Sequence, residues 1–230
     1  MNNKEILKAI EKSTLPKFKN EIFGTSNSKL MKQGIISFDL PAIKTCHFAN
    51  DCVNYCYADK IQKRYKNARL KWLKNEQISL QSDFVDIANN SLKALPNTKF
   101  VRIHSSGDFY SRNYLAKWLQ IAEDNKNTIF YAYTKAAIYF KSINLPPNFL
   151  VCQSLPLVKK SHYQSHLQHA QIFYSLESYN NAIEYGNYIG AKDEDLEAVK
   201  AMIQGKNIAL LDHKLKNKLA RQAKKELINK

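Results

Sequence analysis

The sequence has little of what builds flexible or membrane-bound chains. Its 230 residues include only 6 Gly and 6 Pro, which argues against low-complexity segments and long flexible linkers. No run of about 18 apolar residues is present, so we expect no membrane-spanning segment. The N-terminus, MNNKEILKAIEKS, carries charges where a signal peptide needs its apolar stretch. These absences predict a cytoplasmic protein, with residues 1–230 forming one domain.

Several common catalytic motifs are also missing. The sequence contains no Walker loop, no G-x-G-x-x-G and no nucleophile elbow, which argues against the usual nucleotide hydrolases, dehydrogenases and esterases. Cysteine is scarce as well, with only 4 residues. Two disulfides are disfavoured, because a cytoplasmic protein is kept reduced and three of the cysteines lie in one short stretch.

Positive charge, by contrast, is in excess. Lys and Arg number 35 against 20 Asp and Glu, which gives a formal net charge of +15. A surplus of this size favours nucleic acid or another anionic partner. The alternative is that a Lys-rich and Asn-rich sequence reflects A+T-biased coding and contributes only solubility. The densest basic segments are residues 60–74 and 214–230, and the second is predicted to be a basic C-terminal helix.

Three cysteines, Cys46, Cys52 and Cys56, follow one another with the spacing C-x5-C-x3-C. Thiolates that converge on one short loop are the ligands of soft metals and iron–sulfur clusters. Three of them could hold three irons of a [4Fe–4S] cluster and leave the fourth iron open. Zinc is a poorer match, because structural zinc sites usually have four protein ligands, often in C-x2-C pairs. Redox-active or inert cysteines remain alternatives, and Cys152 is expected to be a buried small hydrophobe.

Strands are predicted to alternate with helices along the chain. Apolar patterning predicts strands at residues 34–40, 99–104, 127–134, 148–155, 171–174 and 207–212. Helices are expected at 4–13, 57–75, 81–94, 111–123, 177–185 and 193–204, from residue 135, and at the C-terminus. Ser79 or Ser82 is the expected N-cap of the helix at 81–94, and Ser111 that of the next helix. We therefore predict a single α/β domain with a mainly parallel sheet, arranged as a partial (β/α) barrel after an N-terminal helical segment.

Polar residues follow three of the predicted strands, at the sheet edge where parallel sheets collect their functional groups. The cysteine loop follows the first strand. The candidate cofactor-binding residues at the next two strand ends are Ser105, Ser106, Gly107, Asp108, Tyr133 and Lys135. Gly107 permits a close backbone approach, and Arg102 and His104 are predicted to share the face that leads into this turn. The alternatives are a plain turn with Asp108 as a helix cap, and core packing for Tyr133.

His162, His166 and His169 recur at helical spacing. Such a set would share one face of a helix and could bind a metal ion. A solvated surface helix is the preferred interpretation, because the segment is polar and no acidic residue is near.

The runs NSKLMKQGIISFDLPAIKTCHFANDCVNYCYADK and VRIHSSGDFYSRNYLAKWLQIAEDNKNTIFYAYTK resemble the phage and plasmid family named after gene product 88. The resemblance covers residues 27–135 and continues weakly beyond them. Ile43 departs from the family pattern, in which Gly follows Leu-Pro-Ala, and His47-Phe48 replaces Pro-Gly. The segment DEDLEAVKAMIQGK lacks the further cysteines of many members, which argues against a second metal site. A phage-encoded member would work in the host cytoplasm.

The family's layout is similar to that of a shortened radical S-adenosylmethionine (SAM) enzyme, with a cysteine loop after strand one and a glycine-bearing turn after strand two. That similarity implies a [4Fe–4S] cluster on the three loop cysteines. In an enzyme of this kind SAM would bind the open iron, Ser106 to Asp108 would position its methionyl end, and Tyr133 and Lys135 would line the pocket. The spacing C-x5-C-x3-C differs from the usual C-x3-C-x2-C. The second hypothesis is a basic nucleic-acid-binding accessory protein of a mobile element, with a purely structural metal site.

Overall fold

A computed structural model describes residues 20–25, 27–95, 97–191 and 195–228. Within these residues seven strands form one sheet, in the order β1-β2-β3-β4-β5-β7-β6. They are β1 (Ile35–Phe38), β2 (Phe100–Ile103), β3 (Ile129–Thr134), β4 (Phe149–Ser154), β5 (Gln168–Phe173), β6 (Tyr188–Gly190) and β7 (Asn207–Leu211). Every adjacent pair is parallel. The predicted α/β fold with a parallel sheet is confirmed, and the sequential order from β1 to β5 fits a partial barrel.

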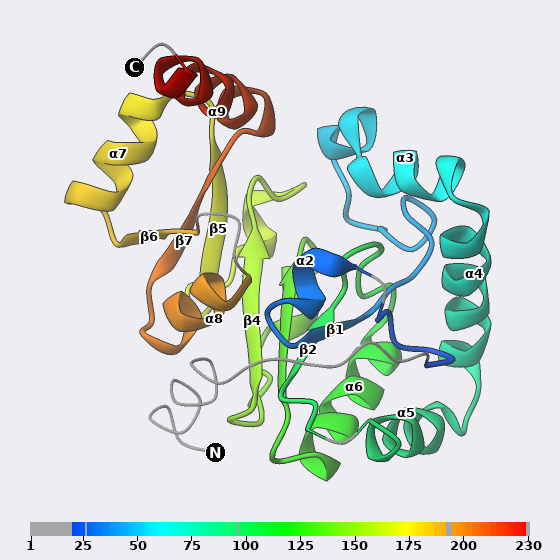
Figure 1. Ribbon diagram of the computed structural model, residues 1–230. Helices are drawn as coiled ribbons and strands as arrows, with labels where there is room; N and C mark the ends of the chain where they lie inside the picture. The colour runs from blue at the N-terminus through cyan, green and yellow to red at the C-terminus, as the bar shows by residue number, and fades with distance from the viewer. Residues whose placement is uncertain (1–19, 26, 96, 192–194, 229–230) are drawn as a thin grey trace.

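Helices connect the strands and cover the sheet (Figure 1). The α-helices are α2 (Ser28–Met31), α3 (Tyr57–Arg64), α4 (Lys66–Leu80), α5 (Phe84–Lys93), α6 (Arg112–Asp124), α7 (Leu176–Tyr185), α8 (Asp195–Ile203) and α9 (His213–Ile228). Three short 3-10 helices are η1 (Asp51–Tyr55), η2 (Ala137–Phe140) and η3 (Lys160–His162). Among the described helices, none combines the length and apolar character that crossing a membrane requires. The helix predicted at 4–13 lies outside the described residues.

Two apolar layers hold the sheet, one on each face. On one face α5 and α6 pack on the strands, and the rings of Phe38 and Trp118 lie 5.1 Å apart there. On the other face α8 packs against Ile35, Phe100 and Tyr131. Because both faces are covered, all four residues of β1 are buried instead of alternating between core and solvent.

Some local predictions were wrong at the ends of helices. The helix expected over 57–75 is two helices, because the chain is extended at Tyr65 (φ −114°, ψ 102°). The helix expected from Lys135 is the single 3-10 turn η2. Asp83, without a side-chain hydrogen bond, precedes α5, whereas Ser79 is buried in α4 and donates to the Glu76 carbonyl at 2.8 Å. The cap of α6 is confirmed, since Ser111 Oγ accepts from the Tyr114 N–H at 3.1 Å.

Candidate functional site

The cysteine loop, residues 41–56, leaves β1 at the carboxyl edge of the sheet. Its first turn is closed by Thr45, whose hydroxyl donates to the Pro41 carbonyl at 2.8 Å. The Cys46 N–H then donates to the Ile43 carbonyl at 3.0 Å. Ile43 has a positive φ of 67°, at the position where the family pattern has Gly. Cys52 lies in η1 and Cys56 directly precedes α3, so the three cysteines are held by one turn, one 3-10 helix and one helix start.

All four cysteines are free thiols, but their surroundings differ. Those of the loop are half-buried, whereas Cys152 is fully buried in β4, as predicted. Burial, together with the negative charges of Asp108, Cys56 and Cys52, raises the pKa of Cys46 to about 12. The three loop thiols are therefore close enough to interact electrostatically, and Cys46 needs a nearby cation to become a thiolate.

The donor set fits an iron–sulfur cluster in its chemistry, since it consists of three thiols on one loop. Its distances are not those of a loaded site: among the described residues no group of three or more His, Cys, Asp or Glu side chains is arranged to hold a metal ion. Metal loading would have to draw the thiols together. No residue of η1, which carries Cys52, is buried in the core.

A buried carboxylate fixes the turn after β2 to the end of β1. Asp39 Oδ1 accepts from the backbone N–H groups of Ser105 at 2.6 Å and Ser106 at 3.2 Å. The Ser37 hydroxyl donates to Oδ2 at 2.8 Å. Burial raises the pKa of Asp39, and these hydrogen bonds oppose the rise. The Ser106 hydroxyl donates to the Leu40 carbonyl at 2.8 Å, so the two strand ends form one rigid unit.

Asp108 fixes the same turn to the end of β3. Its carboxylate accepts from Thr134 Oγ1 at 2.6 Å, from the Lys135 N–H at 2.8 Å and from the Phe109 N–H at 2.7 Å. Burial raises the pKa of Asp108. Gly107 lies between these anchors with φ +86°. The polar atoms of Ser106 and Asp108 are thus used within the protein, which matches the structural-turn alternative more closely than a ligand-binding role.

Ser105 is the exception in this turn. Its hydroxyl oxygen is buried and has no hydrogen-bond partner among the described residues. This hydroxyl could therefore still form a hydrogen bond with a ligand. The backbone carbonyl of Ser105 accepts from the Tyr57 hydroxyl, and Tyr57 directly follows Cys56. Ser105 therefore lies beside the start of α3.

Lys135 and Asn50 join the cysteine loop to the end of β4. Lys135 Nζ donates to the carbonyls of Ser154 at 3.0 Å and Pro156 at 2.7 Å. Asn50, in the loop, donates to the same Pro156 carbonyl at 2.9 Å. Burial lowers the pKa of Lys135, while the negative charges of Cys52 and Asp108 oppose this change. Lys135 thus lies within electrostatic reach of a loop cysteine, and its predicted role in lining a cofactor pocket stays a prediction.

Tyr133 belongs to a polar cluster on the α8 face that the sequence did not reveal. Arg102 lies with Cζ 5.4 Å from the Tyr133 ring centroid, and its Nη1 donates to Asp195 at 2.6 Å. Tyr131 donates to the same carboxylate at 3.1 Å. Asp195 comes from α8, 93 residues away in the chain, and nothing local in the sequence points to that pairing.

His104 does not share a face with Arg102, contrary to the prediction. Its ring packs against Phe38, Phe109 and Tyr114, in the layer under α5 and α6. Arg102 points to the opposite side of the sheet, toward α8. The regular alternation ends with β2 at Ile103, so it does not carry over to the next residue.

The histidine set does not form a helix, so that prediction was wrong. His162 ends η3, whereas His169 lies in β5 and its Nε2 is 2.6 Å from the Tyr188 hydroxyl. His162 instead meets the cysteine loop, with its ring centroid 5.4 Å from that of Phe48. Pairing between β5 and β7 gives this segment its extended conformation.

Comparisons with known proteins place the chain in a family. A sequence profile described as Gene product 88 matches residues 8–228. The Gene 88 protein of Mycobacterium phage L5 is 31% identical, over 41% of this chain and 45% of its own. The Gene 88 protein of Mycobacterium phage D29 is 30% identical over the same shares, so the chain spans less than half the length of these relatives. No solved structure matches. Because the profile covers nearly the whole chain, the protein belongs to the Gene product 88 family.

Proposed function

We propose that this protein binds an iron–sulfur cluster through Cys46, Cys52 and Cys56. The observation that carries the proposal is that three free thiols share one loop at the carboxyl edge of a parallel sheet. Cys46 is half-buried beside Asp108, in a place where its thiolate is disfavoured without a cation. A bound cluster would supply that positive charge and would stabilise all three thiolates.

The surroundings support a cluster with one open position. With three cysteines as ligands, a [4Fe–4S] cluster would keep one iron available to a substrate or to SAM. Lys135 lies within electrostatic reach of Cys52, and the Ser105 hydroxyl, next to the start of α3, has no partner among the described residues. SAM at the open position is part of the proposal. The resemblance to radical SAM enzymes has no support from the comparisons, so it contributes nothing beyond the layout.

The test is anaerobic reconstitution of the purified protein with iron and sulfide. We expect a brown protein with about four irons and four sulfides per chain, and an EPR signal after reduction. Replacement of Cys46, Cys52 or Cys56 by Ser should abolish stable loading. Cys152→Ser is the matched control, because this cysteine is buried in β4 away from the loop, and it should retain the full iron content.

SAM binding is measured on the same sample. A change in the EPR spectrum of the reduced cluster on addition of SAM supports SAM at the open iron. An unchanged spectrum removes SAM from the proposal and leaves the cluster in place. A colourless protein that holds one zinc ion, or iron retention by the three loop variants, would contradict cluster binding itself.

A further inference from the structure

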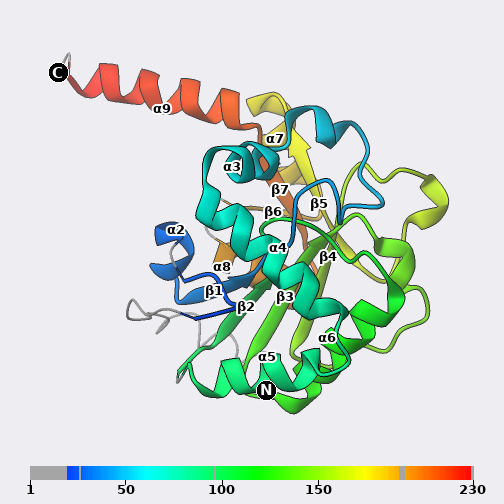
Figure 2. The same cartoon turned by 90° about the vertical axis from the view of Figure 1, so that its right-hand side faces the viewer.

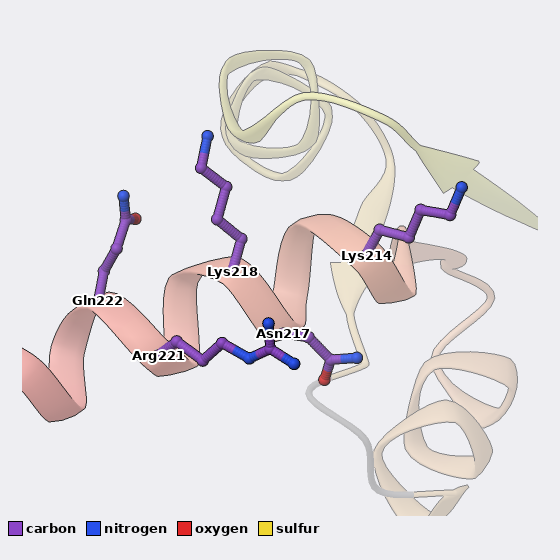
Figure 3. A pocket seen from close by; sticks show the side chains of 5 residues that line it. All are labelled: Lys214, Asn217, Lys218, Arg221 and Gln222. Atoms are coloured by element: carbon purple, nitrogen blue, oxygen red, sulfur yellow. The ribbon is translucent and has the colours of Figure 1, made fainter.

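Helix α9 presents a cationic stripe to solvent. Lys214, Lys218 and Arg221 are exposed and recur at i, i+4 and i+7, so they lie along one side of the helix. With Asn217 and Gln222 they line a surface hollow of about 410 Å³ (Figure 3). Figure 3 shows Lys214, Lys218 and Gln222 extending to the same side of α9, while Arg221 runs along the helix toward Asn217. Figure 2 shows that α9 projects from the body of the molecule.

These cations are not neutralised locally. In the part of the chain that the structure describes, Lys214, Lys218 and Arg221 form no ion pair. The nearest acidic residue in the sequence, Asp212, accepts from the backbone N–H groups of Lys214 and Leu215 as the cap of α9. Three uncompensated charges on one helix side raise the local positive potential, which attracts a polyanion.

The stripe begins beside the cysteine loop. The Asp212 N–H, at the start of α9, donates to the Phe173 carbonyl at 2.9 Å, and Tyr174 follows Phe173 with 69% of its surface exposed. Tyr55 of η1 lies next to Tyr174. The two hydroxyl groups interact, which places the Tyr55 side chain beside that of Tyr174. Tyr55 is 52% exposed, so two accessible aromatic rings lie between the cations and the loop thiols.

We propose that α9 and these two tyrosines form a binding surface for single-stranded nucleic acid. The cations would contact successive phosphates, because a rise of about 1.5 Å per residue sets Lys218 about 6 Å and Arg221 about 10 Å beyond Lys214. Unpaired bases would stack on Tyr174 and Tyr55. A duplex would not bind in this way, because its bases are paired and stacked on one another. A strand bound in this way would pass the cysteine loop. The proposal does not depend on whether that loop holds a cluster.

The experiment measures binding of a fluorescent 20-nucleotide single strand by anisotropy over a series of salt concentrations. The test variant carries Lys214→Glu, Lys218→Glu and Arg221→Glu. The matched control carries Lys93→Glu, Lys99→Glu and Lys126→Glu, which are exposed residues near the opposite edge of the sheet, where β2 and β3 begin. Both variants lose the same net charge, so a difference between them reports the position of the charges. Circular dichroism confirms that both are folded.

We expect the α9 variant to lower the slope of log affinity against log salt by about 2, because three phosphate contacts are lost. Its affinity at about 0.1 M salt should fall on the order of 100-fold, and the control should keep the wild-type slope. Tyr174→Ala should weaken binding about tenfold with the slope unchanged, because stacking releases no counterions.

Three results would overturn the proposal. One is that the protein does not bind the single strand at low salt. Another is that the α9 and control variants lose the same affinity, because binding would then depend on net charge and not on the position of the charges. The third is tighter binding of a duplex than of the single strand, because the tyrosines would then have no stacking role. Binding is measured on protein with and without reconstituted iron, so failure of the cluster proposal leaves this test unaffected.

Discussion

Gly107 shows how much of the site depends on one residue without a side chain. A Cβ at this position would lie 2.6 Å from Leu40 Cβ and 2.6 Å from Thr45 Oγ1. Its φ of +86° is in addition a conformation that L side chains rarely adopt. The turn after β2 can therefore approach the cysteine loop only with glycine here.

We predict that Gly107→Ala destabilises the protein by about 2–4 kcal/mol, since backbone strain and overpacking act together. Gly205→Ala is the control. It has a comparable φ of +67° but no atom within 4 Å of the added Cβ, so strain alone should cost about 1 kcal/mol. Urea unfolding of both variants measures the difference. Equal losses would mean that the contact with Leu40 and Thr45 does not constrain the turn.

His104 makes stability depend on pH. Burial and, to a smaller extent, the nearby charge of Arg102 lower its pKa to about 3, so the ring stays neutral in the folded protein. In the unfolded chain its pKa is about 6.5. The unfolded state therefore binds more protons below pH 6.5. The stabilisation is complete above that pH and is lost as the pH falls toward 3.

We predict that the free energy of unfolding falls about 2 kcal/mol further between pH 7 and pH 5 in the wild type than in His104→Gln. Comparing the two proteins removes the contributions of other titrating groups, such as Asp39 and Asp108. Urea unfolding at the two pH values is the measurement. Parallel losses in wild type and variant would show that His104 can be protonated in the folded state.

At the scale of elements, one ion pair joins α8 to the sheet. The side chains of Arg102 and Asp195 are 20% and 9% exposed, and they meet at 2.6 Å. The sheet-facing residues of α8 include Leu196, Val199 and Met202, so apolar contacts would hold the helix without this pair. Loss of one partner, however, leaves the other charge buried without compensation.

A double-mutant cycle tests this relation. We predict that Arg102→Met alone costs about 3 kcal/mol and that Arg102→Met with Asp195→Leu lies within about 1 kcal/mol of the wild type. Urea unfolding of the two single variants and the double variant gives the coupling. Additive losses would mean that the two side chains do not interact in solution.

At the scale of the whole molecule, the polar and sulfur-bearing features gather at the carboxyl edge of the sheet. The cysteine loop, the turn after β2, the end of β3 and the start of α9 all lie at this edge, because parallel strands end on the same side. The chain has a net charge of +15. Part of this positive charge is concentrated in Lys214, Lys218 and Arg221 of α9, which begins at the carboxyl edge of the sheet. The exposed cations of α9 and the three loop thiols thus lie at one edge of the sheet.

The sequence by itself determined the features that are local. The apolar segments predicted six of the seven described strands and missed β6. The Ser111 cap determined where α6 begins, and the cysteine spacing determined one compact thiol loop. These follow from neighbours in the chain, whose geometry is set by backbone and side-chain preferences. The placement of the candidate site at the carboxyl edge followed from the parallel-sheet rule alone.

Only the tertiary structure decided what the polar residues at that edge do. Ser106 and Asp108 are tied into the frame by Asp39, Leu40 and Thr134, and Arg102 is paired with an aspartate 93 residues away. Pairing with Gln153 of β4 likewise made His169 extended instead of helical. Such contacts join residues that are remote in sequence. Their strength comes from burial, which folding creates, so the sequence shows which side chains are present but not which of them remain free for a ligand.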